Sequence, residues 1–111
     1  MKKLSILIVE DGQIQREMLR DFLRKEGHTV AEAETGERAL AEVRVSYFDL
    51  LLMDYKMPGL NGLETLAEMK RAQVKTPVIV MTAFGTTETA IEAMRLGAYD
   101  YLLKPFDTEE L

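Results

Sequence analysis

Short, nearly continuous runs of apolar residues recur along this chain, and longer segments with helical periodicity separate them. Apolar runs of this length are typical of strands buried on both faces of a parallel sheet. Residues 4–9, 48–53 and 78–81 form three such runs. Residues 99–103 form a fourth with one acidic interruption, and residues 29–33 alternate in polarity as an edge strand does. The pattern therefore predicts five strands.

The segments between these runs carry apolar residues at the spacing of amphipathic helices. Gly27 and Gly97 are placed to end the first and fourth helices, and the turn at residues 58–62 leads into the third. Asp107 and Glu110 predict a capping box that opens a fifth helix, which the end of the chain cuts short. The apolar stripes of the first four helices are Ile14, Met18, Leu19, Phe22 and Leu23; Ala39, Leu40 and Val43; Leu63, Leu66 and Met69; and Ala90, Ile91 and Met94.

Alternating strands and helices predict an α/β fold in which helices cover both faces of a five-stranded parallel sheet. Right-handed crossovers favour the doubly wound (βα)₅ arrangement with strand order 2-1-3-4-5. A chain of 111 residues has room for one domain, so we expect residues 1–111 to form a single unit.

Composition and charge exclude several classes of function. The net charge of −5 argues against direct nucleic-acid binding by this chain. No apolar stretch is long enough to span a membrane, and the first apolar run ends at Glu10 and Asp11, too soon for a secretory signal. The sequence has no cysteine, which fits a reducing compartment and predicts a cytoplasmic location.

Polar side chains follow the predicted central strands at the points where those strands end. Glu10 and Asp11 follow the first strand, Asp54 the third, Thr82 the fourth and Lys104 the fifth. Ligands of open α/β sheets bind at this carboxyl edge. Three neighbouring carboxylates need a positive partner, and oxygen donors suit Mg²⁺. With a lysine and a hydroxyl added, the set predicts a site for phosphoryl transfer.

The same residues stand in motifs that resemble the receiver domains of response regulators in two-component signalling. The resemblance covers the whole chain and implies the flavodoxin-like fold of chemotaxis receivers (CheY-like). Residues 81–106 are most similar to receivers of NtrC-type transcriptional activators, whose output domains would lie outside this chain. The motifs are Val9-Glu10-Asp11; Met53-Asp54 with Met57-Pro58-Gly59 and Gly62; Met81-Thr82-Ala83; and Tyr101 with Lys104-Pro105-Phe106.

This resemblance implies a role for each residue at the rim. Asp54 would accept a phosphoryl group from a sensor histidine kinase, and Lys104 would bind the phosphoryl oxygens. Mg²⁺ would be held by Glu10, Asp11, Asp54 and the backbone carbonyl of Lys56. The chain would thus act as a regulatory domain, an enzyme only toward its own phosphorylation and dephosphorylation.

The resemblance also implies how the phosphorylated state is transmitted. Thr82 and Tyr101 would form the switch pair, and the bond before Pro105 would be cis. Because phosphorylation adds negative charge at the rim, we also expect it to favour a receiver–receiver homodimer through the fourth helix and last strand. We expect Ala90, Ala93, Met94 and Tyr99 to lie on or near that surface.

Two alternatives differ in class from a signalling switch. A Mg²⁺-dependent phosphatase of the haloacid-dehalogenase type also uses an aspartate nucleophile, but it carries a second acid two residues later, where this chain has Lys56. A degenerate receiver that only mediates contacts usually lacks one of the acceptor, acid, threonine or lysine positions. This chain has them all.

Overall fold

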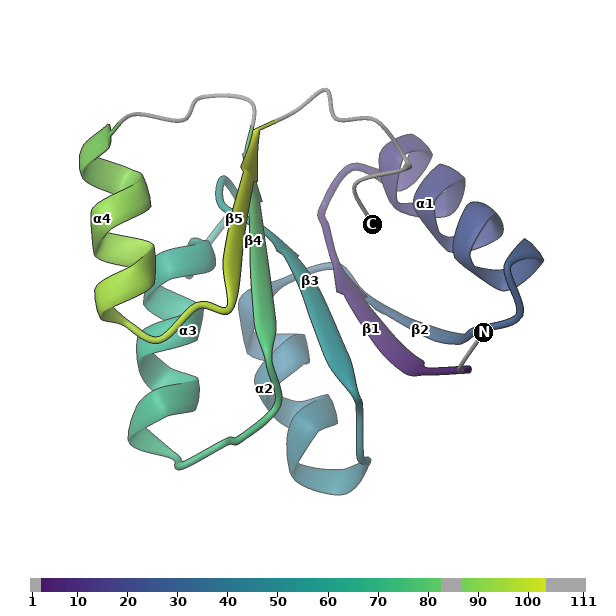
Figure 1. The fold of residues 1–111 in the computed structure, drawn as a ribbon, viewed down its shortest axis with the longest axis horizontal. Helices are drawn as coiled ribbons and strands as arrows, with labels where there is room; N and C mark the ends of the chain where they lie inside the picture. The colour runs from purple at the N-terminus through teal and green to yellow at the C-terminus, as the bar shows by residue number, and fades with distance from the viewer. Residues whose placement is uncertain (1–2, 83–86, 104–111) are drawn as a thin grey trace.

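The computed structural model describes residues 3–82 and 87–103, which form five strands and four helices in strict alternation (Figure 1). The predicted fifth helix, together with Lys104 and Pro105, lies outside these residues. The elements are β1 (Ser5–Val9), α1 (Gln13–Lys25), β2 (Thr29–Ala33), α2 (Gly36–Val45), β3 (Leu50–Asp54), α3 (Gly62–Arg71), β4 (Val78–Thr82), α4 (Thr87–Arg95) and β5 (Asp100–Leu103).

The strands form one parallel sheet in the order β2-β1-β3-β4-β5, which confirms the predicted topology. Strand β3 begins later than the sequence predicted, at Leu50 instead of Phe48. Before it, the carboxylate of Asp49 accepts hydrogen bonds from the backbone N–H of Ser5 at 2.7 Å and from the hydroxyl of Tyr47 at 3.0 Å. These bonds fix the entry to the strand, so regular pairing starts only after Asp49.

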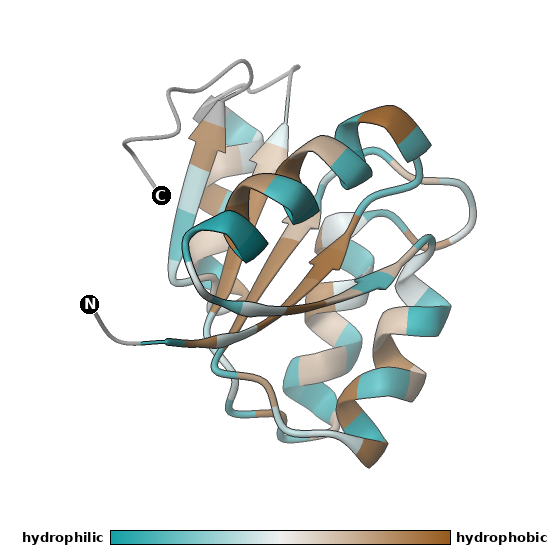
Figure 2. Ribbon diagram, turned by 90° about the vertical axis from the view of Figure 1, so that its right-hand side faces the viewer, coloured by the Kyte–Doolittle hydropathy of each residue, from teal (hydrophilic) through white to brown (hydrophobic). Residues whose placement is uncertain are grey.

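The helices are divided unequally between the two faces of the sheet. Helix α1 packs over β1 and β2 on one face, whereas α2, α3 and α4 cover the other (Figure 1). The strands between them are mainly hydrophobic (Figure 2). Leu7, Val9, Leu51 and Met53 belong to the core on the three-helix face, and Ile8 belongs to the core under α1. Alternate strand residues therefore serve opposite cores, as the period of a strand requires.

The glycines end α1 and α4 as predicted, and a capping box that the sequence analysis did not predict begins α3. Gly27 and Gly97 follow α1 and α4 with φ of 97° and 95°, a left-handed conformation that glycine adopts without steric cost. Helix α3 begins with a capping box in which Asn61 and Glu64 each accept a hydrogen bond from the other's backbone N–H. These caps set where each helix meets the sheet.

The predicted apolar stripe of α1 is partly wrong. Leu19 and Leu23 pack on the core under the helix, but Ile14 and Met18 are 72% and 68% exposed. The inward position of the first turns is taken instead by Arg16, which is buried. Among residues 3–82 and 87–103, none of the helices has the length and apolar content needed to cross a bilayer.

Candidate functional site

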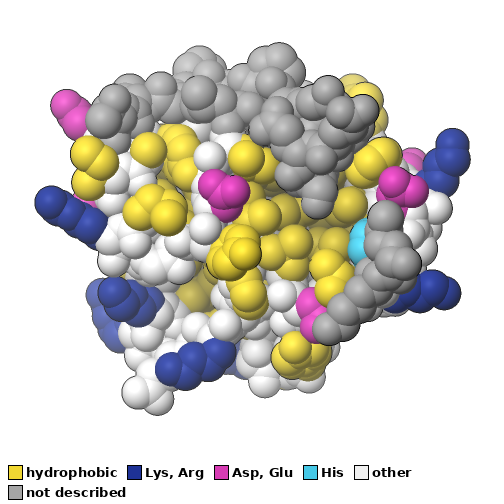
Figure 3. All heavy atoms as spheres, viewed as in Figure 1, with side chains coloured by type: hydrophobic (Ala, Val, Ile, Leu, Met, Phe, Trp, Pro, Cys, Tyr) yellow, Lys and Arg dark blue, Asp and Glu magenta, His cyan; other side chains and the backbone are white. Residues whose placement is uncertain are grey.

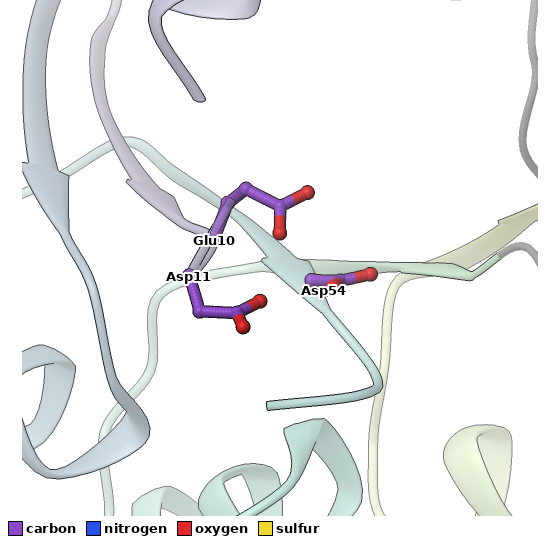
Figure 4. Close-up of side chains that lie close together, drawn as sticks. All are labelled: Glu10, Asp11 and Asp54. Atoms are coloured by element: carbon purple, nitrogen blue, oxygen red, sulfur yellow. The ribbon is translucent and has the colours of Figure 1, made fainter. Parts of the chain in front are cut away.

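Three carboxylates converge at the carboxyl edge of the sheet. Glu10 and Asp11 follow β1, and Asp54 is the last residue of β3, its neighbour in the sheet. One oxygen from each side chain lies within 4.8 Å of the others, and the three groups point into one space (Figure 4). The structure thus brings together the three acids that the sequence analysis selected.

The cluster is sheltered on one side and open on the other. Glu10 and Asp54 are 5% and 8% exposed, while Asp11 is exposed. Acidic groups held this close repel unless a cation joins them. A hard ion that takes a few protein oxygens and keeps several waters fits this set, because one carboxylate faces solvent and all three donors are oxygens.

The backbone around Asp54 is held from two sides. The N–H of Tyr55 donates to the carbonyl of Met81 at 2.8 Å, and the N–H of Gly62 donates to the carbonyl of Tyr55 at 2.6 Å. A methyl group on Gly62 would lie 2.5 Å from the carbonyl oxygen of Asp54. Helix α3 therefore starts against the backbone of Asp54, an approach that only glycine permits.

The predicted switch residues lie on the strands beyond Asp54. Thr82 ends β4 one residue past Met81, the partner of Asp54, and its side chain is buried. Tyr101 on β5 is partly buried against the core of the three-helix face. Its hydroxyl lies 2.7 Å from Oγ1 of Thr89 on α4.

The surface expected to carry the output differs in part from the prediction, and Ala90 is half-buried. Ala93 is fully buried in the core and cannot contribute to a surface patch. Met94 and Tyr99 are exposed as expected, and Ile91 is exposed beside them. We call Ile91, Met94 and Tyr99 the α4–β5 patch. Apolar side chains gather over α4 and over the strands beside it when the molecule is viewed as in Figure 3.

Of the two lysines predicted for the site, the structure describes only Lys56. Lys56 is exposed in the turn after β3, two residues beyond Asp54. Lys104 lies outside the described residues, as does the bond to Pro105, so their roles stay predictions.

Sequence reasoning missed one residue that touches the site. Arg16 is 8% exposed, and its Nη1 donates to the backbone carbonyl of Glu10 at 3.0 Å. The only signal in the sequence is a basic residue in the inward phase of α1, four residues after Gly12 and three before Leu19. Such a position reads as an interruption of the apolar stripe unless the facing groups are known.

Comparison with known proteins decides the family. The sequence model of the family described as response regulator receiver domain matches residues 6–111. The chain belongs to this family. It is a receiver domain of two-component response regulators, and receiver domains are regulatory switches. A phosphatase of the haloacid-dehalogenase type is not favoured.

Relatives place this receiver domain close to transcriptional regulators. It is 44% identical over 109 residues to the transcriptional regulatory protein ZraR of Salmonella typhimurium and 43% identical over 106 residues to the regulatory protein AtoC of Escherichia coli. These alignments cover 98% and 96% of the chain but 25% and 23% of the relatives. The chain thus spans about a quarter of these NtrC-family regulators, and the expected resemblance to NtrC-type receivers is confirmed.

Solved structures share the fold over nearly the whole receiver domain. The receiver domain of the Francisella response regulator 1452 has a TM-score of 0.92 at 29% identity, covering 97% of this chain and 89% of that one. The response regulator TrrA of Thermotoga maritima, solved in complex with Mg²⁺-BeF, has a TM-score of 0.86 at 32% identity, covering 98% and 92%. Receiver domains use Mg²⁺ in general, and the acidic cluster described above could hold such an ion.

Proposed function

We propose that this receiver domain is switched by phosphorylation of Asp54. The observation that carries the proposal is the convergence of Glu10, Asp11 and Asp54, whose oxygens lie within 4.8 Å of one another at the carboxyl edge. Asp54 ends a central strand, and Gly62 and Tyr55 hold its backbone in place. A rigidly held carboxylate at an open rim is suited to attack a group presented from outside.

In this proposal Glu10, Asp11 and Asp54 hold Mg²⁺, with the backbone carbonyl of Lys56 as a further ligand. When bound, the ion neutralises the negative charge of the acids and of the phosphoryl oxygens. Glu10 and Asp54 are fixed by burial, which favours a set geometry over a diffuse attraction of cations. Asp11, being exposed, leaves room for water and for the incoming phosphoryl group.

The proposed reaction transfers a phosphoryl group from a phosphohistidine to Asp54. A carboxylate oxygen of Asp54 forms a bond to phosphorus while the bond from phosphorus to the imidazole nitrogen breaks, and the electron pair of that bond leaves with the imidazole. Lys104 and the hydroxyl of Thr82 would bind phosphoryl oxygens. Attack of water on phosphorus later releases phosphate and restores the carboxylate, so the signal ends by itself.

The donor in this proposal is a sensor histidine kinase, met in the cytoplasm. Ile14 and Met18 form an exposed apolar pair one turn apart on α1, the helix that begins two residues after Asp11. We assign this pair, the α1 patch, to the kinase contact. A partner docked there would present its phosphohistidine to the rim beside it.

The proposed output runs through Thr82, Tyr101 and the α4–β5 patch. A phosphoryl group on Asp54 adds about 1.5 to 2 negative charges and three acceptor oxygens at the rim. Thr82 would turn toward them, and the ring of Tyr101 would turn inward beside β4. The patch formed by Ile91, Met94 and Tyr99 would then pair with a second receiver domain and pass the state to an output module that controls transcription.

Mass measurement after incubation with acetyl phosphate tests the core of this proposal. We expect one phosphoryl mass on the unaltered chain with Mg²⁺, and none without the ion. Asp54→Asn should abolish the gain, while Asp100→Asn, an exposed acid at the other end of the sheet, should leave it unchanged. Full labelling of the Asp54→Asn variant, or equal labelling without Mg²⁺, would overturn the assignment.

A further inference from the structure

The described part of the chain contains one buried basic side chain, that of Arg16. No other lysine or arginine among residues 3–82 and 87–103 is buried. A buried guanidinium is costly unless its charge and its N–H groups are satisfied. The partners of Arg16 therefore indicate the role of this buried side chain.

These partners come from two different segments. Nη1 donates to the carbonyl of Glu10 at 3.0 Å, and Nε donates to Oε1 of Glu32 on β2 at 3.0 Å. Nη2 lies 3.7 Å from a carboxylate oxygen of Glu34. One planar group thus joins the edge strand to the peptide that links Glu10 and Asp11.

Glu32 is held in turn by a second arginine. Its Oε2 accepts from Nη1 of Arg20 at 3.1 Å, so its two oxygens are shared between consecutive turns of α1. Partial burial raises the pKa of Glu32, but the bonds from Arg20 and Arg16 outweigh that effect and leave the pKa below its ordinary value. Glu32 is therefore ionised at neutral pH and offsets the charge that Arg16 brings close to the acids.

Both polar backbone groups of Glu10 depend on β2. The N–H of Glu10 donates to the carbonyl of Ala33 at 3.0 Å, and the carbonyl of Glu10 is tied to Glu32 through Arg16. The peptide plane between Glu10 and Asp11 sets the direction in which both carboxylates leave the chain. Fixing that plane fixes two of the three acids relative to Asp54.

We propose that Arg16, anchored by Glu32, is a positioning residue that orients Glu10 and Asp11 for Mg²⁺. The inference rests on the proposed metal site. It means that the edge strand β2 affects the affinity for the ion although it contributes no ligand. Arg16 itself touches neither the ion nor the acceptor. Outer partners of metal ligands typically change affinity by about 10- to 100-fold when they are removed.

The test compares two arginines on the same helix. Arg16→Met should weaken Mg²⁺ binding at least about 10-fold, as measured by calorimetric titration with the metal alone. Arg24→Met is the matched control: Arg24 also bridges α1 to β2, donating to the carbonyl of Val30 at 3.0 Å, but it lies two turns further from the rim. Its Mg²⁺ affinity should equal that of the unaltered chain.

A spectroscopic readout separates positioning from a loss of stability. The NMR resonances of the Glu10 backbone carbonyl and the Asp11 amide nitrogen should change position in metal-free Arg16→Met. They should stay unchanged in Arg24→Met. Glu32→Gln, which keeps the shape of the side chain, should also weaken Mg²⁺ binding, by a smaller factor than Arg16→Met. Thermal unfolding of the metal-free variants shows whether each is folded at the titration temperature.

The outcomes distinguish this inference from the proposed function. If the unaltered chain binds Mg²⁺ and Arg16→Met binds it equally well, the positioning role is wrong and the metal site stands. Equal weakening in Arg16→Met and Arg24→Met would also overturn the role, because general loosening of α1 would explain both. If the unaltered chain shows no Mg²⁺ binding, the metal site and the positioning role fall together. If Arg16→Met is unfolded, Glu32→Gln decides, and unchanged affinity there overturns the inference.

Discussion

The phenolic hydroxyl of Tyr101 on β5 lies 2.7 Å from Oγ1 of Thr89 on α4. Either oxygen can donate the hydrogen bond. The bond holds the aromatic ring against the helix that carries Ile91 and Met94. It therefore links the strand of the proposed switch residue directly to the α4–β5 patch.

Replacing Thr89 with valine removes this bond with little change in volume. We expect the free energy of unfolding to fall by about 0.5 to 1.5 kcal/mol, the usual net worth of one hydrogen bond, as measured by urea titration. Tyr101→Phe removes the same bond from its other end. The double variant should cost less than the sum of the two single variants, because the bond can be lost only once. Additive costs would show that the two hydroxyls do not interact.

Gly62→Ala tests the close approach of α3 to the proposed acceptor. The added methyl would meet the carbonyl oxygen of Asp54 at 2.5 Å and Cα of Tyr55 at 2.9 Å, both backbone atoms. We expect a loss of stability of about 1 to 3 kcal/mol, as for other overpacked sites, and slower phosphorylation by acetyl phosphate. Gly97→Ala is the control, because its φ of 95° costs about 1 to 2 kcal/mol, but among the described residues no atom beyond its two chain neighbours lies within 4 Å of the new methyl. It should be destabilised yet phosphorylated at the normal rate.

The stability contributed by Glu32 should depend on pH in a defined direction. Its pKa is lowered in the folded chain from an ordinary value of 4.5, so the folded state binds this proton less readily than the unfolded state. The contribution is then present above the ordinary pKa and is lost as the pH falls through the lowered one. The stabilities of the unaltered chain and Glu32→Gln, measured by urea titration, should differ most near about pH 7, and the difference should shrink as the pH falls below the ordinary pKa. A difference that stays constant across this range would contradict the assignment.

Variants at two exposed methionines test the two proposed contact surfaces independently. Met94→Arg should prevent the dimer that beryllofluoride with Mg²⁺ is expected to induce, because it places a charge within the α4–β5 patch. Met18→Arg lies in the α1 patch and should dimerise normally but accept phosphate more slowly from a histidine kinase that phosphorylates the unaltered chain. Sedimentation and phosphotransfer assays measure the two effects. Both variants should react normally with acetyl phosphate, and an exchange of the two phenotypes would refute the assignment of the surfaces.

The sequence by itself determined the sheet and the positions of its acids. Buried parallel strands need nearly continuous apolar runs, and those runs end at Glu10, Asp11 and Asp54. Because parallel strands place their carboxyl ends at one edge, the order along the chain is enough to predict that these side chains meet. The glycines that end α1 and α4 were also predictable from the sequence, because a left-handed cap is a local requirement.

Only the tertiary structure decided which faces of the helices are buried and what holds the acids in place. Periodicity groups Ile14 and Met18 with Leu19, but α1 turns Arg16, Leu19 and Leu23 inward and leaves the other two in solvent. The choice depends on Glu32 and the carbonyl of Glu10, which offer charge and hydrogen bonds on that side. Likewise, Ala93 is buried because the core of the three-helix face meets it, although it belongs to the same helix as the exposed Met94. Such partners are distant in sequence or belong to the backbone, so no pattern within one helix records them.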